Sequence, residues 1–187
     1  MMAKKYNPVK VITGVVRLLN ANIWEPLEVP DRGSIYTATI LIPKNDSKTV
    51  LGINTAIQGA FAVGRLARKG HVGRNPMQNY PLHDGDDGSL PTVFNGCYYI
   101  NAASLTAPQI LDHQLNPVTD ASTVGSGCLA RVSLSFFYIF RPRASRVGCM
   151  LGNIQKARIS DSYEALPDAG FENCLDDYLL IFDKGPG

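Results

Sequence analysis

The chain has 187 residues, 45% of them hydrophobic and 18% charged, and its formal net charge is +2. This composition is typical of a single globular domain, and it favours neither general disorder nor a fibrous repeat. Gly, Arg or Pro interrupts the apolar runs well before the ~20 residues that a membrane-spanning helix requires. We therefore expect one packed core and no membrane segment.

Charge is unevenly distributed along the chain. Residues 1–160 hold seventeen Lys/Arg and nine Asp/Glu, whereas residues 161–187 hold seven carboxylates and the single cation Lys184. A basic body attracts a polyanion, and a tethered acidic end can compete for the same surface. The sequence therefore predicts a polyanion-binding domain at residues 1–160 and an acidic C-terminal tail at residues 161–187.

The four cysteines, Cys97, Cys128, Cys149 and Cys174, are spread singly along the chain. They form no C-x-x-C pair and have no histidine at zinc-finger spacing, so we expect no structural metal. An even number would permit two disulfides. Because no signal peptide is recognisable, we favour reduced thiols in a cytoplasm, with the first three as small buried apolar groups.

Two strands and a helix are predicted in the first part of the chain. Residues 9–19 and 35–42 are rich in β-branched side chains, which favours strands. Asp46 or Ser47 can cap a helix that ends at Gly70. The apolar positions of this helix recur at helical spacing: Val50, Ile53, Ile57, Phe61 and Gly64.

The remainder of the body is predicted to be mainly β. Residues 71–96 are dense in Gly, Pro, Asn and Asp, which is typical of a functional or mobile loop. Further strands are predicted over residues 96–102, 108–112, 127–141 and 147–158. With at least six short strands, one helix and no βαβ alternation, the pattern favours an antiparallel barrel or sandwich.

The strand at residues 127–141 has two different faces. Its even positions are apolar and are predicted to face the core: Cys128, Ala130, Val132, Leu134, Phe136, Tyr138 and Phe140. The odd face offers Arg131 and Phe137 to a nucleic acid, because a ring stacks any base and an arginine neutralises phosphate. The alternative is that Phe137 lies under the helix or a partner subunit and Arg131 is an ordinary surface residue.

Two groups of cations extend this candidate site. The turn RPRASR is either a phosphate clamp, which is the interpretation we favour, or a solvated turn. The second group follows the predicted helix, where the helix dipole also favours cations when no ligand is present. The two groups consist of Arg141, Arg143 and Arg146, and of Arg65, Arg68, Lys69 and Arg74.

Three aromatic residues need a separate assignment. Alternation along residues 96–102 makes Tyr99, rather than Tyr98, the candidate for an exposed ring that stacks a base. Tyr80 and Trp24 lie in segments with turn residues, where an aromatic side chain either stacks a base or staples the loop. We favour a staple for Trp24 and keep Tyr80 as a candidate for stacking.

The sequence gives little support for a catalytic or metal-binding site. The run DGDDG at residues 84–88 suggests a calcium loop, but Asn95 stands where an EF-hand needs a bidentate carboxylate. The three histidines lack metal-ligand spacing, and no Ser, Cys or Thr lies in a nucleophile motif. The glycines of the predicted helix are not followed by the Gly-Lys-Ser/Thr of a P-loop. We therefore expect that the protein is not an enzyme.

Five segments in one order resemble a family of known proteins. They are LIPKNDSKT at 41–49, PLHDGD at 81–86, GCYYINAAS with PQILD at 96–112, SGCLARVSLSFF at 126–137 and GNIQKAR at 152–158. Together they resemble bacteriophage single-stranded-DNA-binding proteins, long catalogued as a domain of unknown function. The resemblance implies an oligonucleotide-binding (OB) barrel, a role in phage DNA replication and recombination, and no cofactor. OB barrels bind single strands on an aromatic and basic face.

The C-terminal end departs from this family. Its members commonly finish in a dense acidic tail closing on carboxylates and an aromatic, whereas here YLLIFD is followed by Lys184 and three more residues. The candidate residues for autoinhibition, or for recruiting phage DNA polymerase and helicase/primase, are Asp176, Asp177, Phe182 and Asp183. In the alternative, the apolar run at 178–182 packs on the barrel or on a neighbouring subunit.

These observations predict a mainly β protein, an OB-type antiparallel barrel with one main helix, that coats and protects single-stranded DNA without sequence specificity. We expect it to act in the host bacterial cytoplasm as a homo-oligomer. Two other classes stay open. One is a structural virion or tail β-barrel protein, and the other is a metal-dependent nuclease that uses Asp84, Asp86 and Asp87.

Overall fold

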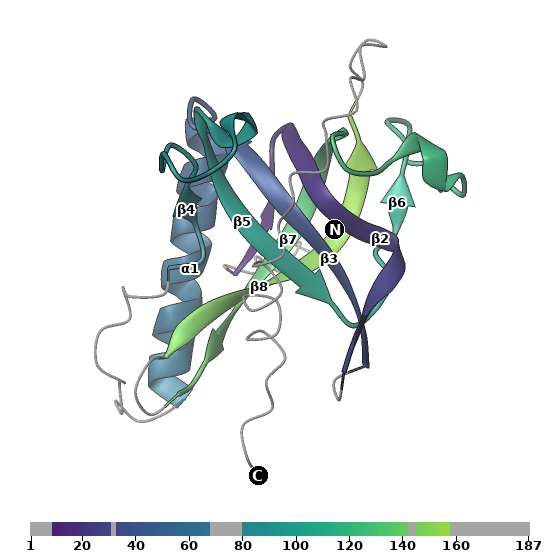
Figure 1. Ribbon diagram of the computed structural model, residues 1–187. Helices are drawn as coiled ribbons and strands as arrows, with labels where there is room; N and C mark the ends of the chain where they lie inside the picture. Colours follow the sequence, from purple (N-terminus) through teal and green to yellow (C-terminus); the bar gives the residue numbers. More distant parts are fainter. Residues whose placement is uncertain (1–8, 31–32, 68–79, 142–144, 158–187) are drawn as a thin grey trace, which may run out of the picture.

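A computed structural model describes residues 9–30, 33–67, 80–141 and 145–157. Figure 1 shows one long helix beside a strongly curved sheet. The elements are β1 Lys10–Ile12, β2 Val16–Val29, β3 Gly33–Pro43, α1 Ser47–Ala67, β4 His83–Asp84, the 3-10 turn η2 Thr92–Phe94, β5 Cys97–Ser104, β6 Ile110–Leu111, the 3-10 turn η3 Ala121–Thr123, β7 Leu129–Ile139 and β8 Arg146–Lys156.

Five of these strands close into a barrel. β3 pairs antiparallel with β2 and β5, and β7 pairs antiparallel with β2 and β8. The ring closes between β5 and β8, which run parallel where Ala103 meets Met150. The short strands β1, β4 and β6 join β7, β5 and β8. This strand order is that of an OB barrel, so the predicted fold class is confirmed.

The segment predicted as one strand at residues 9–19 is two strands. The hydroxyl of Thr13 accepts the backbone N–H of Val132 at 3.0 Å, and the carbonyl of Thr13 instead accepts a hydrogen bond from Arg131 Nε at 3.2 Å. The backbone N–H of Thr13 still donates to the carbonyl of Val132 at 3.0 Å, but the return hydrogen bond of the ladder is lost, and β1 ends at Ile12. The prediction of one strand was therefore wrong, because a side chain far away in sequence determines the break.

β2 also runs further than predicted, to Val29, and includes Trp24. This residue therefore lies in a strand and not in a segment of turns. Its indole N–H donates a hydrogen bond to the carbonyl of Val124 at 2.7 Å, next to η3. Trp24 thus staples a loop to the barrel, as predicted.

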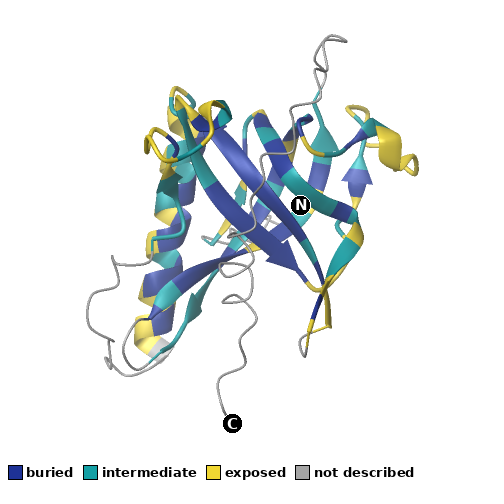
Figure 2. Cartoon of the chain, in the orientation of Figure 1, coloured by how far each residue is buried: buried dark blue, intermediate teal, exposed yellow. Residues whose placement is uncertain are grey.

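α1 begins at Ser47, where the sequence predicts a helix start. The carboxylate of Asp46 accepts the backbone N–H of Thr49 at 3.1 Å and so caps the helix. Ile53 and Ile57 on the barrel side are fully buried, and Figure 2 shows buried residues along α1 and through the central strands. The predicted end at Gly70 lies outside the described residues. Within those residues, no helix is long and apolar enough to cross a membrane.

As far as Phe136, β7 alternates as predicted between a core face and an outward face, whereas Tyr138 and Phe140, also predicted to face the core, are only half-buried. Ala130, Val132 and Leu134 are fully buried and Phe136 is 2% exposed, whereas Arg131 is exposed. The residues on this inner face belong to one core shared with α1 and the other barrel strands. Two of the cysteines, Cys128 and Cys149, are buried, Cys97 is half-buried, and Cys174 lies outside the described residues.

Candidate nucleic-acid interface

The outward face of the barrel carries one row of residues that crosses five strands. Thr37 of β3 is opposite Ala103 of β5, which meets Met150 of β8. Met150 is opposite Ser135 of β7, and Ser135 is opposite Lys10 of β1. Thr37 and Ala103 are buried, whereas Met150 is 43% exposed and Lys10 is exposed. We call these residues the outward row.

The outward row begins on the surface that other OB folds use. Oligonucleotides bind in general to the outward face of the second and third barrel strands, which here are β3 and β5. Polar side chains pair on this face: Asn22 Nδ2 donates to Thr37 Oγ1 at 3.0 Å, and Thr39 Oγ1 donates to Asn101 Oδ1 at 2.8 Å. The row therefore connects this polar face with the face of β7 that the sequence singled out.

Phe137 lies on the outward face of β7, opposite Gly148 of β8. Its ring lies close against this glycine, because a Cβ placed on Gly148 would be 2.6 Å from Phe137 Cζ and 3.0 Å from Ile139 Cδ1. The ring is half-buried. The sequence pattern predicts a ring that stands out freely from the sheet. The ring instead packs on β8, because Gly148 has no side chain and leaves room for it.

Arg131 lies on the same outward face and is exposed. Its Nε donates to the carbonyl of Thr13, which orients the guanidinium group. The neighbouring hydroxyl of Ser133 accepts the backbone N–H of Asn153 at 2.8 Å, at a register shift between β7 and β8. Arg131 is thus placed for a ligand, whereas Ser133 already has a structural partner.

The predicted cation groups are only partly described. Arg141 is half-buried at the start of the β7–β8 turn, where its Nη1 donates to the carbonyl of Phe140 at 3.1 Å and its backbone N–H donates to Ser145 Oγ at 3.3 Å. Arg65 is exposed near the end of α1. The residues that lie outside the described ranges are Arg143, Arg68, Lys69 and Arg74, together with the tail candidates Asp176, Asp177, Phe182 and Asp183.

Tyr99 is not the exposed ring that alternation predicted. It points outward, but His83 stacks on it at 4.9 Å between ring centroids and Phe94 meets it edge-on at 5.1 Å. Phe94 is fully buried against Leu19 and Leu41 in a second, smaller apolar cluster. The loop that contains η2 thus packs over this end of the outward face, which alternation along one strand cannot reveal.

Tyr80 is also held by the fold. Its hydroxyl donates to Asn54 Oδ1 of α1 at 2.6 Å, and its ring packs against the main core. Burial raises the pKa of this phenol above its ordinary value. Tyr80 is therefore placed as a staple between the loop and α1, which was the alternative to stacking a base.

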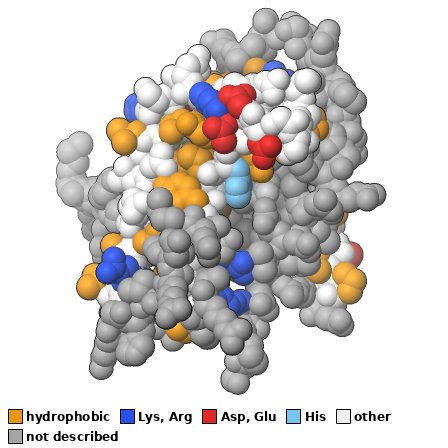
Figure 3. Space-filling view, turned by 60° about the vertical axis from the view of Figure 1, so that its left-hand side comes forward, with side chains coloured by type: hydrophobic (Ala, Val, Ile, Leu, Met, Phe, Trp, Pro, Cys, Tyr) orange, Lys and Arg blue, Asp and Glu red, His pale blue; other side chains and the backbone are white. Residues whose placement is uncertain are grey.

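The carboxylates of the DGDDG run bind a lysine of the neighbouring strand end. Lys44 Nζ contacts Asp84 Oδ1 at 2.5 Å and Asp86 Oδ2 at 2.6 Å, and Asp86 also accepts the backbone N–H of Gly96 at 2.7 Å. Lys44 holds the pKa of both carboxyl groups below the usual value. On the face shown in Figure 3, acidic side chains lie beside a basic one and a histidine. Across the described ranges, no group of three His, Cys, Asp or Glu residues could hold a metal ion.

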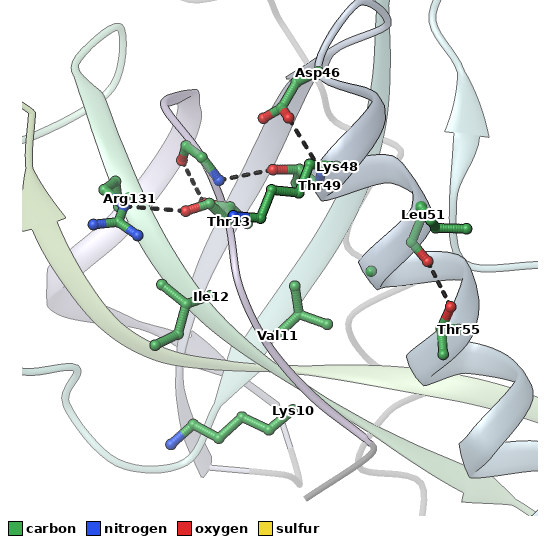
Figure 4. A pocket seen from close by; sticks show the side chains of 12 residues that line it. Lys10, Val11, Ile12, Thr13, Asp46, Lys48, Thr49, Leu51, Thr55 and Arg131 are labelled. Atoms are coloured by element: carbon green, nitrogen blue, oxygen red, sulfur yellow. Dashed lines mark hydrogen bonds between the residues drawn. The ribbon is translucent and has the colours of Figure 1, made fainter. Parts of the chain in front are cut away.

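Three basic side chains line a cleft near the end of the outward row. It lies between β1, the start of α1 and β7, and Lys10, Lys48 and Arg131 line it. Figure 4 shows these three side chains, from three different elements, around the same opening. Sequence reasoning missed Lys10 and Met150, although alternation along their strands would have placed both outward. It also missed Lys48, which reaches the cleft only through the packing of α1 beside β1.

The barrel places this chain among the OB-fold proteins, and a comparison with family models narrows the class. Residues 9–172 match a family described as the single-stranded-DNA-binding protein of Enterobacter phage Enc34. The chain therefore belongs to this family of phage proteins, and the predicted resemblance is confirmed. A comparison with curated proteins finds no match.

Solved structures of phage proteins share the fold. The single-stranded-DNA-binding protein of bacteriophage Enc34 superposes with a TM-score of 0.69 at 19% identity, over 92% of this chain and 92% of that chain. The same protein in complex with single-stranded DNA gives 0.67 at 18% identity, over 85% and 92%. The single-stranded-DNA-binding protein gp2.5 of bacteriophage T7 gives 0.58 at 16% identity, over 87% and 96%.

Proposed function

We propose that this protein binds single-stranded DNA without sequence specificity and coats and protects it during phage DNA replication and recombination. The observation that carries the proposal is the match of residues 9–172 to a phage single-stranded-DNA-binding family. The OB barrel formed by the described residues supports it, since this fold binds oligonucleotides in many proteins. No catalytic residue is part of the proposal.

In the proposed complex, the strand lies along the outward face of β7 and the exposed end of the outward row at Met150 and Lys10. A base stacks on the side of the Phe137 ring that faces away from Gly148, and Arg131 and Lys10 neutralise phosphates. Arg141 and the remaining predicted cations, Arg143, Arg65, Arg68, Lys69 and Arg74, extend the contact to the phosphate backbone. Stacking and charge neutralisation do not distinguish bases, so binding tolerates any sequence.

The proposal extends to domain organisation and partners. Residues 1–160 form the binding domain, and the tail at residues 161–187 competes for its basic surface or recruits phage DNA polymerase and helicase/primase. We further propose a homo-oligomer that acts in the host bacterial cytoplasm. A tethered tail is effective as a competitor because its effective concentration near the surface is high.

Fluorescence anisotropy with labelled oligonucleotides tests the proposal. The protein should bind oligo-dT and a mixed-sequence single strand with similar affinity, and should bind a duplex of equal length more weakly. It should leave all of them intact after incubation with Mg²⁺. Absence of binding at low salt would favour a structural virion protein, and degradation of the DNA would favour the nuclease.

A further inference from the structure

The cleft between β1 and α1 has the size and lining of a ligand site. Its volume is about 460 Å³, and the lining comes from β1, the β1–β2 connection, the first turns of α1 and Arg131 of β7. Ile12 at its edge is 63% exposed and Leu51 is 68% exposed. The cleft is therefore lined by both apolar and polar side chains, and two of the apolar ones are exposed.

Positive charge is concentrated at this cleft. The described residues contain nine Lys/Arg and eight Asp/Glu, so they are nearly neutral as a group. Three of these nine cations line the cleft, whereas Asp46 is the only one of the eight carboxylates that does. Lys10, Lys48 and Arg131 form no ion pair among the described residues. The cleft thus offers a local positive potential that the described part of the chain as a whole lacks.

The structure also orients one of these cations for an anion. Arg131 Nε is held by the carbonyl of Thr13, which leaves the Nη groups of the guanidinium for a ligand. The one acid, Asp46, caps the N–H of Thr49 through Oδ1, and its carboxylate packs against Gly14. The carboxylate of Asp46 is therefore already engaged by the N–H of Thr49.

Lys48 occupies a position that folding alone does not favour. It follows Ser47 in the first turn of α1, a turn that contains no acidic residue. The positive end of the helix dipole lies there and disfavours a cation, and among the described residues the capping carboxylate of Asp46 is the only negative group that lines the cleft. An anion in the cleft would compensate this cost.

We propose that this cleft binds a backbone phosphate of single-stranded DNA through Lys10, Lys48 and Arg131. The inference rests on the proposed function and specifies part of its path. Lys10 belongs both to the outward row and to the cleft, so a strand that follows the row reaches the cleft at its β1 end. Ile12 and Leu51 then contact the adjoining sugar and base.

Charge-neutralising variants test this inference. Lys48→Gln and Lys10→Gln remove a cation from the cleft, and Lys156→Gln removes one from β8, which does not line it. Each cleft variant should lower the affinity for single-stranded DNA about threefold to tenfold at low salt and reduce the steepness of log affinity against log salt by about 0.7. The control should change both far less. Lys48→Gln should keep or raise the thermal unfolding midpoint, since the dipole disfavours the lysine.

The outcomes distinguish a failure of the proposed function from a failure of the inference about the cleft. If the wild-type protein binds no single-stranded DNA at any salt concentration, the proposed function itself is wrong. If it binds, and both cleft variants behave like Lys156→Gln, the cleft does not hold a phosphate of the strand. Calorimetry with free dTMP distinguishes the source of the phosphate. Binding of dTMP that Lys48→Gln abolishes, with unchanged affinity for DNA, would assign the cleft to a free nucleotide and overturn this inference.

Discussion

The ring of Phe137 lies against Gly148 on the neighbouring strand, with Cζ 2.6 Å from the position of a Cβ on that glycine. Any side chain at residue 148 would displace the ring. The glycine therefore fixes where an aromatic surface is presented beside the β7–β8 turn. A ring that is already held in place loses little conformational freedom when a base stacks on it.

Replacing Phe137 should affect binding rather than folding. Phe137→Ala removes a half-buried outward ring, and we expect single-strand affinity to fall by ~1–3 kcal/mol with little change in stability. Phe136→Ala is the matched variant on the core face, where a cavity should cost ~3–5 kcal/mol of unfolding free energy. Anisotropy and urea denaturation of both variants measure the two effects. The opposite pattern would place the wrong face of β7 in the interface.

The contact between α1 and the barrel should be intolerant of one added methyl group. The ring of Tyr138 lies where a Cβ of Gly64 would stand, so Gly64→Ala forces the helix away from β7. We expect a loss of ~1–3 kcal/mol in unfolding free energy. Gly88→Ala is the control, because a Cβ there meets no atom within 4 Å. Equal stability of the two variants in urea would mean that α1 packs differently.

The Lys44 cluster predicts a pH dependence. The pKa values of Asp84 and Asp86 are lowered from the ordinary 3.8, chiefly by hydrogen bonds from Lys44. Groups with a lowered folded-state pKa stabilise the protein above their unfolded pKa, and this contribution is lost as the pH falls through the folded value. The double variant Asp84→Asn with Asp86→Asn should therefore be less stable than the wild type near neutral pH. The gap in urea midpoint should start to narrow below about pH 4 and close once the pH is below the folded-state pKa values, and a gap independent of pH would argue against this ion-pair cluster.

Removing residues 161–187 should tighten binding at low salt. The segment carries seven carboxylates and one lysine, tethered to a basic body. Deleting a tethered competitor raises affinity, and the gain should shrink as salt screens both partners. Light scattering on the same truncated protein checks the alternative, since a tail that packs on apolar surface would leave an aggregating or dissociated protein. Unchanged affinity and unchanged size would rule out both roles for the tail.

The sequence correctly predicted those elements that depend only on residues close together in the chain. β7 and its two faces follow from strict alternation, and the start of α1 follows from the cap at Asp46. The break between β1 and β2 could not be predicted in this way, because it depends on contacts of Thr13 with residues more than a hundred positions away.

The candidate site was predicted in part for the same reason. Arg131 and Phe137 were found from the odd positions of one strand. Tyr99 was assigned the correct side of its strand, but the loop with η2 covers it. Lys48 was missed because its neighbours in the cleft come from β1 and β7, which only the folded chain brings together.

The salt dependence of single-strand binding tests the central claim most directly. If cations of this barrel neutralise backbone phosphates, the logarithm of affinity should fall linearly with the logarithm of salt concentration, by about 0.7 for each phosphate neutralised. Equilibrium titrations of an unstructured oligonucleotide over a range of salt concentrations measure this slope. A steep negative slope is the predicted result, and an affinity that does not change with salt would contradict the account.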